Sequence, residues 1–141
     1  MIKLNKVVIV VILLLSISIK AQVTFLKHRN QIEISDWKFK KGVIYNAHQN
    51  EFDSSSWESV SVPHTYSMDA INDVAYDKVK AWYRSEFTTK KTTDERTFIR
   101  FEAVGQEAKI YVNGKYIGQH IGGYSAFCFD ITDAITSGRN L

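Results

Sequence analysis

One segment of this chain has a conformation that its sequence alone dictates. Residues 108–112 alternate, with Ala108, Ile110 and Val112 on one face, and Asn113-Gly114 follows directly. A two-residue turn of type I′ needs positive φ at both central positions, which Asn and Gly tolerate best. The sequence therefore predicts a β-hairpin, with residues 115–120 as its return strand.

Short alternating segments recur along the rest of the chain. We expect strands at residues 37–41, 60–62, 81–88, 98–104 and 127–131, and loops at residues 45–56 and 65–80. Pro63 ends the second strand because its ring removes a backbone donor and biases Val62 toward extended geometry. No helical period interrupts this spacing. The pattern predicts an all-β fold, specifically a β-sandwich.

The first 21 residues have the features of an export signal. Lys3 and Lys6 precede an apolar run at residues 7–19, and Ala21 supplies a small residue at the cleavage point. The run is shorter than the roughly 20 residues that span a bilayer. We therefore expect a signal peptide at residues 1–21 and an exported domain, periplasmic or extracellular, at residues 22–141. An uncleaved anchor is the alternative, because Ile19 is not small.

The positive charge of the chain belongs to that signal. The sequence has 18 Lys and Arg against 15 Asp and Glu, but three of the lysines precede Gln22 and no acidic residue does. Residues 22–141 are therefore neutral, with 15 charges of each sign. A neutral domain argues against nucleic acid as a partner, and against a membrane surface once the signal is removed.

Several kinds of site are disfavoured by residue counts. The four histidines have no metal-ligand spacing, so we expect neither a metal site nor a cofactor in this chain. Cys128, the only cysteine, has no partner for a disulfide and is expected to be a small buried residue between Phe127 and Phe129. At 141 residues the chain is too short for a (β/α)₈ barrel, which needs roughly 250.

Seven segments, taken in order, resemble the opening part of glycoside hydrolase family 2, which includes β-galactosidases, β-glucuronidases and β-mannosidases. They are WESVSVPHTY at residues 57–66, AWYRSEF at 81–87, FEAV at 101–104, AKIYVNGK at 108–115, GQHIGGYSAF at 118–127, FDIT at 129–132 and GRNL at 138–141. The chain departs from the usual pattern at Tyr66, where the family usually has Trp, and at Ala81, where it has Gly. Both changes are conservative and leave the fold assignment unchanged.

The resemblance implies a jelly-roll sandwich that binds sugar and precedes an immunoglobulin-like domain and a catalytic barrel. Family members continue after residues 138–141 with a further strand, so we interpret the chain as a fragment whose sandwich is incomplete at its C-terminal end. The missing C-terminal domains of the same polypeptide are then its expected partners. The two catalytic glutamates of a retaining glycosidase would lie in the barrel, so no catalytic residue is expected here. Glu102 and Glu107 flank a turn and are interpreted as surface carboxylates.

Substrate contacts are expected from the loop at residues 65–80. In the family, a loop of this region can reach the barrel and contact the sugar at its nonreducing end. Asn72, Asp73 and Tyr76 are the candidate substrate-binding residues, since amide, carboxylate and aromatic groups suit a pyranose. The competing interpretation is a solvated loop whose acidic residues cap turns.

The other motif residues are interpreted as structural. Trp82 and Arg84 share a strand face, where the guanidinium could stack on the indole or meet a carboxylate. His64 and His120 could line a polar cleft, but a histidine that fixes a loop is the commoner case. The remaining members of this group are Pro63, Tyr83, Asn113, Gly114, Gly122, Gly123 and Tyr124, the two adjacent glycines serving special backbone conformations.

These observations lead to one function and two alternatives. The sequence predicts the N-terminal carbohydrate-binding domain of an exported family 2 glycoside hydrolase that acts on a terminal β-glycoside. Among the activities of the family, β-galactosidase is the one that we expect first. A free-standing carbohydrate-binding module without catalysis is the first alternative. An adhesion or scaffold sandwich, which would need a substantial exposed apolar patch, is the second.

Overall fold

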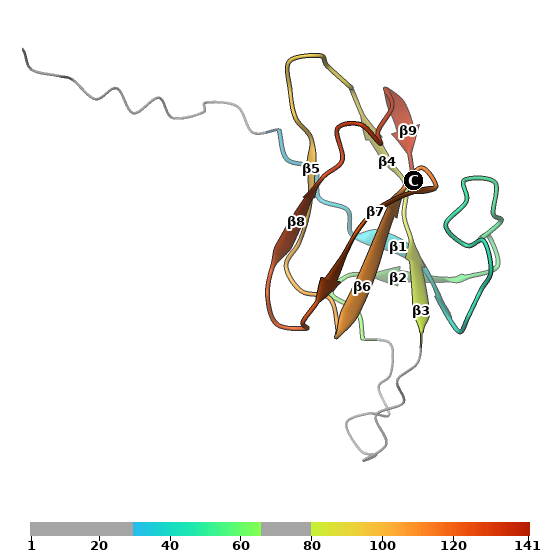
Figure 1. Ribbon diagram of the computed structural model, residues 1–141. Helices are drawn as coiled ribbons and strands as arrows, with labels where there is room; N and C mark the ends of the chain where they lie inside the picture. Colours follow the sequence, from blue (N-terminus) through green and yellow to red (C-terminus); the bar gives the residue numbers. More distant parts are fainter. Residues whose placement is uncertain (1–29, 66–79) are drawn as a thin grey trace, which may run out of the picture. The chain divides into compact units, whose positions relative to one another are not determined.

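A computed structural model describes residues 30–65 and 80–141 of the chain, and residues 33–141 form one compact unit. The described residues contain strands and no helix (Figure 1). The strands are β1 (Asp36–Lys41), β2 (Glu58–Ser61), β3 (Ala81–Arg84), β4 (Phe87–Thr89), β5 (Phe98–Phe101), β6 (Glu107–Val112), β7 (Lys115–Ile121), β8 (Phe127–Asp130) and β9 (Gly138–Asn140). The predicted all-β class is confirmed.

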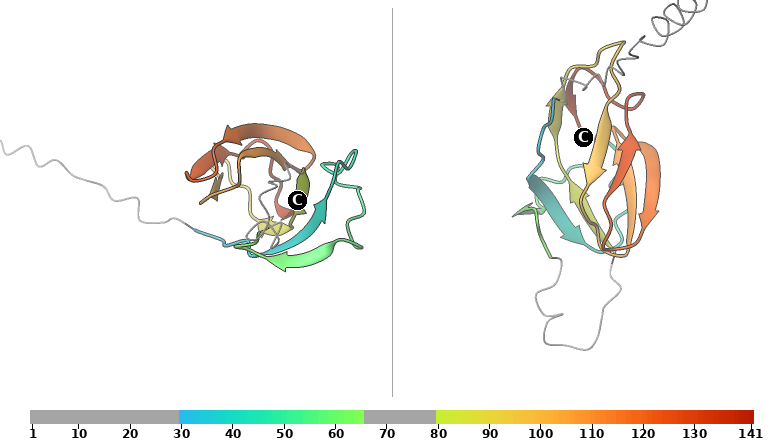
Figure 2. Two further views of the ribbon diagram at one scale, coloured as in Figure 1. Left: turned by 90° about the horizontal axis from the view of Figure 1, so that it is seen from below. Right: turned by 90° about the vertical axis from the view of Figure 1, so that its left-hand side faces the viewer.

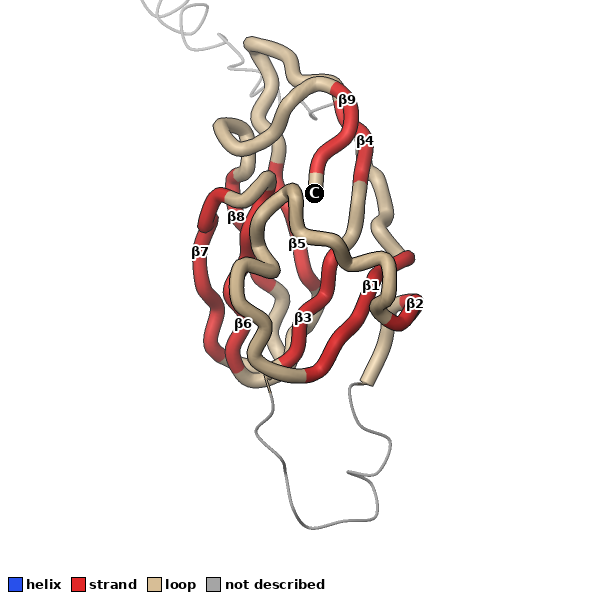
Figure 3. Tube along the Cα trace, turned by 90° about the vertical axis from the view of Figure 1, so that its right-hand side faces the viewer, coloured by secondary structure: helices blue, strands red, loops and turns tan. Residues whose placement is uncertain are grey.

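All strand pairs in this part of the chain are antiparallel. One sheet has the order β2-β1-β3, and the other pairs are β4-β9, β5-β8 and β6-β7. Strands β1 and β2 lie on one side of the unit, and β6, β7 and β8 lie on the opposite side (Figure 2). Long loops connect several of the strands, as the tube in Figure 3 shows, whereas two residues separate β6 from β7 and β3 from β4. The arrangement is the expected β-sandwich of jelly-roll type.

The β6-β7 hairpin forms as predicted. Asn113 and Gly114 have φ angles of 50° and 77°, the positive values that a type I′ turn requires. The register shifts between Ile110 and Tyr111, so β7 carries an extra residue relative to β6 at this point. Such a bulge changes which side chains face inward on the two halves of a strand pair.

The main core lies between the hairpin and the segment after β8. Val112, Ile131 and Ile135 are buried together. Phe87, Ile99, Ile117 and Ala134 pack around them and are partly buried. Each fully buried valine or isoleucine contributes about 1.5–3 kcal/mol relative to an exposed one. The inward faces predicted for residues 108–112 and 127–131 are therefore confirmed. In the strand predicted at residues 98–104, Ile99 and Phe101 are partly buried as expected, but β5 ends at Phe101 and Ala103 beyond it is exposed.

Two further expectations about the strands were wrong. The strand predicted at residues 81–88 is divided at Ser85 and Glu86 into β3 and β4, because β3 pairs with β1 while β4 pairs with β9. Cys128 is exposed, not buried. Phe127 and Phe129 point inward, so the residue between them must point to the other face of the strand. The strand predicted at residues 60–62 is observed as β2, two residues earlier at its start.

Asn140 is 1% exposed and uses both ends of its side-chain amide. Its Nδ2 donates to the carbonyl oxygens of Thr136 and Gly138, each at 2.9 Å. Its Oδ1 accepts from the backbone nitrogen of Thr136 at 2.7 Å and from Nδ2 of Asn113 at 2.8 Å. A buried polar group is tolerated only when it is paired, and this amide is paired at both atoms.

The side chain of Asn113 extends this network to the end of the chain. Its Nδ2 also donates to the carbonyl of Ala134 at 2.9 Å, and its Oδ1 accepts from the backbone nitrogen of Leu141 at 3.0 Å. The backbone nitrogen of Asn113 donates to the carbonyl of Leu141 at 2.9 Å. Two asparagines thus join the hairpin turn, the segment after β8 and strand β9.

We expect Asn140→Ala to lower the free energy of unfolding by about 3 kcal/mol, because it leaves several buried donors and acceptors unpaired. Urea denaturation followed by circular dichroism measures the change. Asn50→Ala, at an exposed position, is the matched control and should change stability by less than about 0.5 kcal/mol. Equal stabilities of the two variants would contradict the role of this network.

Candidate functional site

The predicted sugar-contacting residues Asn72, Asp73 and Tyr76 lie outside the described residues. The structure does describe both ends of the segment that carries them, up to Thr65 and from Lys80. The carbonyl of Lys80 accepts a hydrogen bond from the backbone nitrogen of Gly42 at 2.8 Å. The far end of the segment is therefore fixed to the residue that follows β1.

His64 and Tyr83 connect the two ends of that segment. The Nδ1 of His64 and the hydroxyl of Tyr83 share a hydrogen bond of 2.8 Å. Phe39, buried on β1, packs edge-on against His64 with the ring centroids 4.8 Å apart, and lies 4.9 Å from the ring of Tyr83. His64 is thus placed as a histidine that fixes a loop, and Phe39 is a member of this cluster that the motifs did not single out.

Tyr83 is half-buried in this cluster, and its surroundings change its acidity. Burial raises the pKa of the phenol above its usual value of about 10, and the carboxylate of Glu58 adds to the effect. Both causes disfavour the phenolate. The neutral hydroxyl therefore persists in the folded protein at a pH where an exposed tyrosine would ionise.

Arg84 is 7% exposed and binds backbone carbonyls, which corrects the expectation of an indole or carboxylate partner. Its guanidinium donates to the carbonyl oxygens of Ala47, of Gln49 at 3.1 Å and of Phe52 at 3.4 Å. The same group lies 5.6 Å from the centre of the Phe52 ring. Burial lowers the pKa of Arg84, with the carboxylate of Glu86 acting in the opposite direction. Its Nε has no hydrogen-bond acceptor within the described residues.

Trp82 belongs to a row of aromatic rings. Its ring centroid lies 6.2 Å from that of Tyr111 on β6, and Tyr111 in turn meets His48 at 5.1 Å and Tyr116 at 5.5 Å. This row joins β3, the loop after β1 and the hairpin. The sequence pattern missed it, since its members come from three separate segments.

His120 lies near the end of β7, and the two adjacent glycines follow in the turn after it. The ring of His120 stacks on Phe127 at 4.1 Å, and its Nε2 shares a hydrogen bond of 3.2 Å with the hydroxyl of Ser125. Gly122 has a φ of 129°, closed to other residues, whereas at Gly123 a Cβ would lie 3.3 Å from the backbone nitrogen of Gln106. Tyr124, next to them, is fully exposed.

The surface carboxylates Glu102 and Glu107 are paired with cations. Glu102 accepts from Nε of Arg100 at 2.8 Å, and Glu107 lies 3.6 Å from Nζ of Lys109. The hydrogen bond from Arg100 lowers the pKa of Glu102, whereas the general acid of a glycosidase needs a raised one. Among residues 30–65 and 80–141 there is also no group of three or more His, Cys, Asp or Glu side chains that could hold a metal ion.

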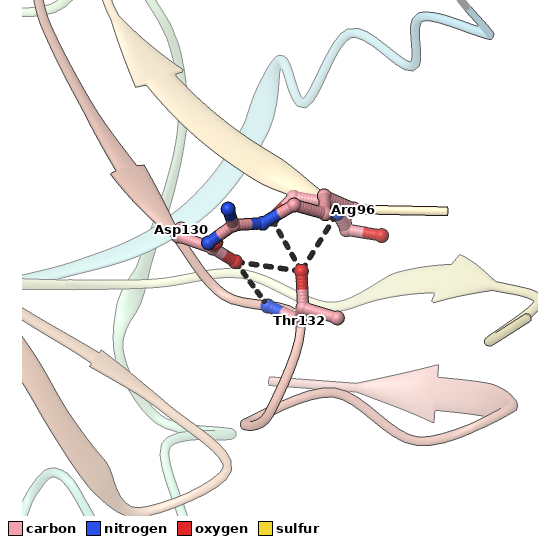
Figure 4. Close-up of polar contacts among 4 residues, drawn as sticks. Arg96, Asp130 and Thr132 are labelled. Carbon is pink, nitrogen blue, oxygen red and sulfur yellow. Dashed lines mark hydrogen bonds and ion pairs between the residues drawn. The ribbon is translucent and has the colours of Figure 1, made fainter. Parts of the chain in front are cut away.

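A polar cluster of Arg96, Asp130 and Thr132 lies where β8 ends. Asp130 accepts hydrogen bonds at Oδ1 from the backbone nitrogen of Thr132 at 2.9 Å and from its hydroxyl at 2.6 Å, and Oδ2 pairs with Arg96 (Figure 4). The bonds from Thr132 are the larger cause of a lowered pKa of Asp130, and Arg96 contributes less. The carboxylate is therefore ionised and held in one orientation.

The fold and these surfaces define a class of protein: a jelly-roll β-sandwich that presents aromatic and polar side chains on its strands and loops. The sequence model described as the sugar-binding domain of glycosyl hydrolases family 2 matches residues 34–141. The chain therefore belongs to glycosyl hydrolase family 2, as the seven motif segments predicted.

Curated relatives carry two kinds of name. A β-galactosidase of Thermoanaerobacter pseudethanolicus is 37% identical over 108 residues, which are 74% of this chain and 14% of the relative. A β-glucuronidase of Formosa agariphila is 32% identical over 115 residues, or 74% and 12%. A β-glucuronidase of Bacteroides fragilis is 32% identical over 91% of this chain and 17% of the relative. The chain spans less than a fifth of the length of each.

Solved structures agree with the fold. Residues of this chain superpose on β-glucuronidase 2 of Bacteroides uniformis with a TM-score of 0.67 and 35% identity, over 78% of this chain and 14% of that one. A family 2 member from Bacteroides cellulosilyticus gives a TM-score of 0.63 at 26% identity, over 78% and 16%. The matched part is thus a small domain of a much larger protein in each case.

We expect the stability of the protein to fall above pH 10 through Tyr83. Its pKa is raised in the folded state, so above about pH 10 the unfolded chain binds fewer protons than the folded one and the free energy of unfolding falls as pH rises. Tyr83→Phe removes this contribution, and its stability should fall less steeply. Urea denaturation at a series of pH values from 8 to 11 measures the slopes.

Below pH 10 the same variant should be less stable than the wild type by about 1 kcal/mol, because it loses the hydrogen bond to His64. Tyr45→Phe, at an 83% exposed position, is the control and should follow the wild-type curve throughout. Parallel curves for Tyr83→Phe and the wild type above pH 10 would contradict this account.

Proposed function

We propose that this chain is the N-terminal carbohydrate-binding domain of an exported family 2 glycoside hydrolase that removes terminal β-galactosyl residues. The observation that carries the proposal is the match of the family's sugar-binding domain to residues 34–141. The relative named β-galactosidase, at 37% identity over 108 residues, supports the choice of galactoside. The fixed base of the segment at residues 66–79 gives that segment a rigid attachment from which to contact a sugar.

A terminal β-glucuronide is the second candidate substrate. It is favoured by the 35% identity to a solved β-glucuronidase of Bacteroides uniformis and by the curated relatives of that name. The two substrates differ in one charge, since a glucuronide carries a carboxylate at physiological pH and a galactoside does not. A cation in the sugar site would distinguish them.

We assign the catalytic step to glutamates outside this chain. A retaining hydrolase needs two carboxyl groups about 5 Å apart, one as nucleophile and one as acid and base. The carboxylates of Glu102 and Glu107 pair with neighbouring cations and suit a solvated surface. The domains that follow in the same polypeptide are therefore the proposed partners, and Asn72, Asp73 and Tyr76 remain the proposed sugar contacts.

The activity is tested with the polypeptide encoded by the whole reading frame. We expect it to hydrolyse 4-nitrophenyl β-galactoside with a kcat/KM at least about 100-fold above that for the glucuronide and the mannoside, because unpaired buried polar groups penalise the wrong sugar. Residues 22–141 alone should release no nitrophenol. A stop codon directly after Leu141, together with sugar binding by this chain alone, would instead favour the free-standing module.

Export is tested on the mature protein. We expect signal cleavage after Ala21, so that the protein recovered outside the cytoplasm begins at Gln22, because residues 1–21 combine a basic start, an apolar run and a small residue. Mass spectrometry of the N-terminal peptide measures this. A protein that retains Met1 and stays with the membrane fraction would support the uncleaved anchor. Within the described residues no helix is long and apolar enough to cross a bilayer.

A further inference from the structure

A small depression lies where β7 begins and β8 ends. Its volume is about 280 Å³, and its walls are Lys115, Tyr116, Ile117, Asp130, Asp133 and Ala134. Ile117 and Ala134 also pack against the buried residues of the main core, so one part of the wall is anchored in that core. The depression is far from the base of the segment at residues 66–79 in sequence and shares none of the residues that fix it.

Tyr116 supplies the aromatic wall. Its side chain is 51% exposed, and its ring meets Tyr111 edge-on at 5.5 Å. Tyr111 is itself packed against Trp82 and His48, so the Tyr116 ring is supported from the side by an aromatic row. A tyrosine with a fixed ring offers a large contact area at low cost in conformational entropy. Such a ring suits the apolar face of a pyranose.

Polar groups on the other walls can bind hydroxyls. The carboxylate of Asp130 is fixed by Thr132 and Arg96 (Figure 4). Within the described residues, the side chains of Asp133 and Lys115 have neither a hydrogen bond nor an ion pair. One acceptor and one donor are therefore available beside the ring of Tyr116, as a sugar site requires.

The charges around the depression favour a neutral ligand. The walls carry two negative charges, on Asp130 and Asp133, and one positive charge, on Lys115. Arg96 adds a second positive charge nearby, and it forms an ion pair with Asp130. No surplus positive charge is left to bind a uronate carboxylate. The volume lies at the lower edge of small-molecule sites, roughly 300–1,000 Å³, and suits one sugar ring better than a protein partner, which buries about 800 Å² on each side.

We propose that this depression is a subsite for one neutral pyranose of a β-linked oligosaccharide, with Tyr116 stacking on the ring and Asp133 and Lys115 hydrogen-bonding its hydroxyls. The subsite rests on the proposed function for its ligand class. It lies on the sandwich itself and binds sugar without taking part in bond cleavage. It would hold a distant ring of a long substrate and so favour oligosaccharides over small glycosides.

Binding is measured by titration calorimetry on the full polypeptide with a sulfur-linked β-1,4-galactotetraose, which resists hydrolysis. We expect Tyr116→Ala to raise the dissociation constant about 5- to 10-fold, because an aromatic contact is lost. Tyr116→Phe keeps the ring and should bind like the wild type. Tyr45→Ala removes another exposed tyrosine and is the matched control, expected to be unchanged. The corresponding tetragalacturonate should not bind at this subsite, so Tyr116→Ala should leave its affinity unchanged.

Asp133→Asn provides a second variant, at an exposed position where a substitution is expected to change stability little, and it should weaken binding about 3-fold. Hydrolysis of 4-nitrophenyl β-galactoside should be the same in all these variants, since that substrate has a single sugar ring. An unchanged dissociation constant in both Tyr116→Ala and Asp133→Asn would overturn the subsite, as would tetragalacturonate binding that Tyr116→Ala weakens. If the wild-type protein does not hydrolyse 4-nitrophenyl β-galactoside but binds the tetraose in a way that depends on Tyr116, the proposed enzyme activity is overturned and the subsite is not.

Discussion

The paired amides of Asn113 and Asn140 are the contact on which the rest of this sandwich depends. Asn140 is buried on the last strand, and Asn113 stands in the tight turn of the hairpin. Their hydrogen bonds reach Ala134, Thr136, Gly138 and Leu141, so three segments that share no sheet are joined at one point. Each of these groups would be costly to bury alone, and together they satisfy one another. The core of Val112, Ile131 and Ile135 packs against the same segments.

A buried arginine organises the loop that lies beside the hairpin turn, where His48 and Asn50 approach Gly114. Arg84 lies on β3, and its guanidinium binds three carbonyls of the loop at residues 47–52. Burying a charged group costs several kcal/mol unless its donors are paired. The carbonyls of the loop therefore make the burial of the Arg84 guanidinium possible. The alternating residue, Tyr83, faces the other side and binds His64. One short strand therefore fixes both the loop after β1 and the base of the segment that carries the proposed sugar contacts.

Local patterns account for the parts of the fold that the sequence predicted. The hairpin follows from Asn113-Gly114 because positive φ angles at both positions are a property of those residues. The inward faces of β5, β6 and β8 follow from alternation, since period two is a property of a strand. The division between β3 and β4 was not predictable, because it depends on which strands pair with each half. The candidates Asn72, Asp73 and Tyr76 remain predictions, while the depression beside Tyr116 arises from segments that sequence spacing does not bring together.

The sequence by itself determined the strand class, the hairpin and the family, because each rests on short motifs whose residues are adjacent in the chain. It also determined that residues 22–141 are neutral. Only the tertiary structure decided what the motif residues contact. Arg84 binds carbonyls from residues more than 30 positions earlier, and Asn113 binds a side chain 27 positions later. Backbone carbonyls leave no mark in a sequence, and the partner of a buried amide is set by how distant segments pack.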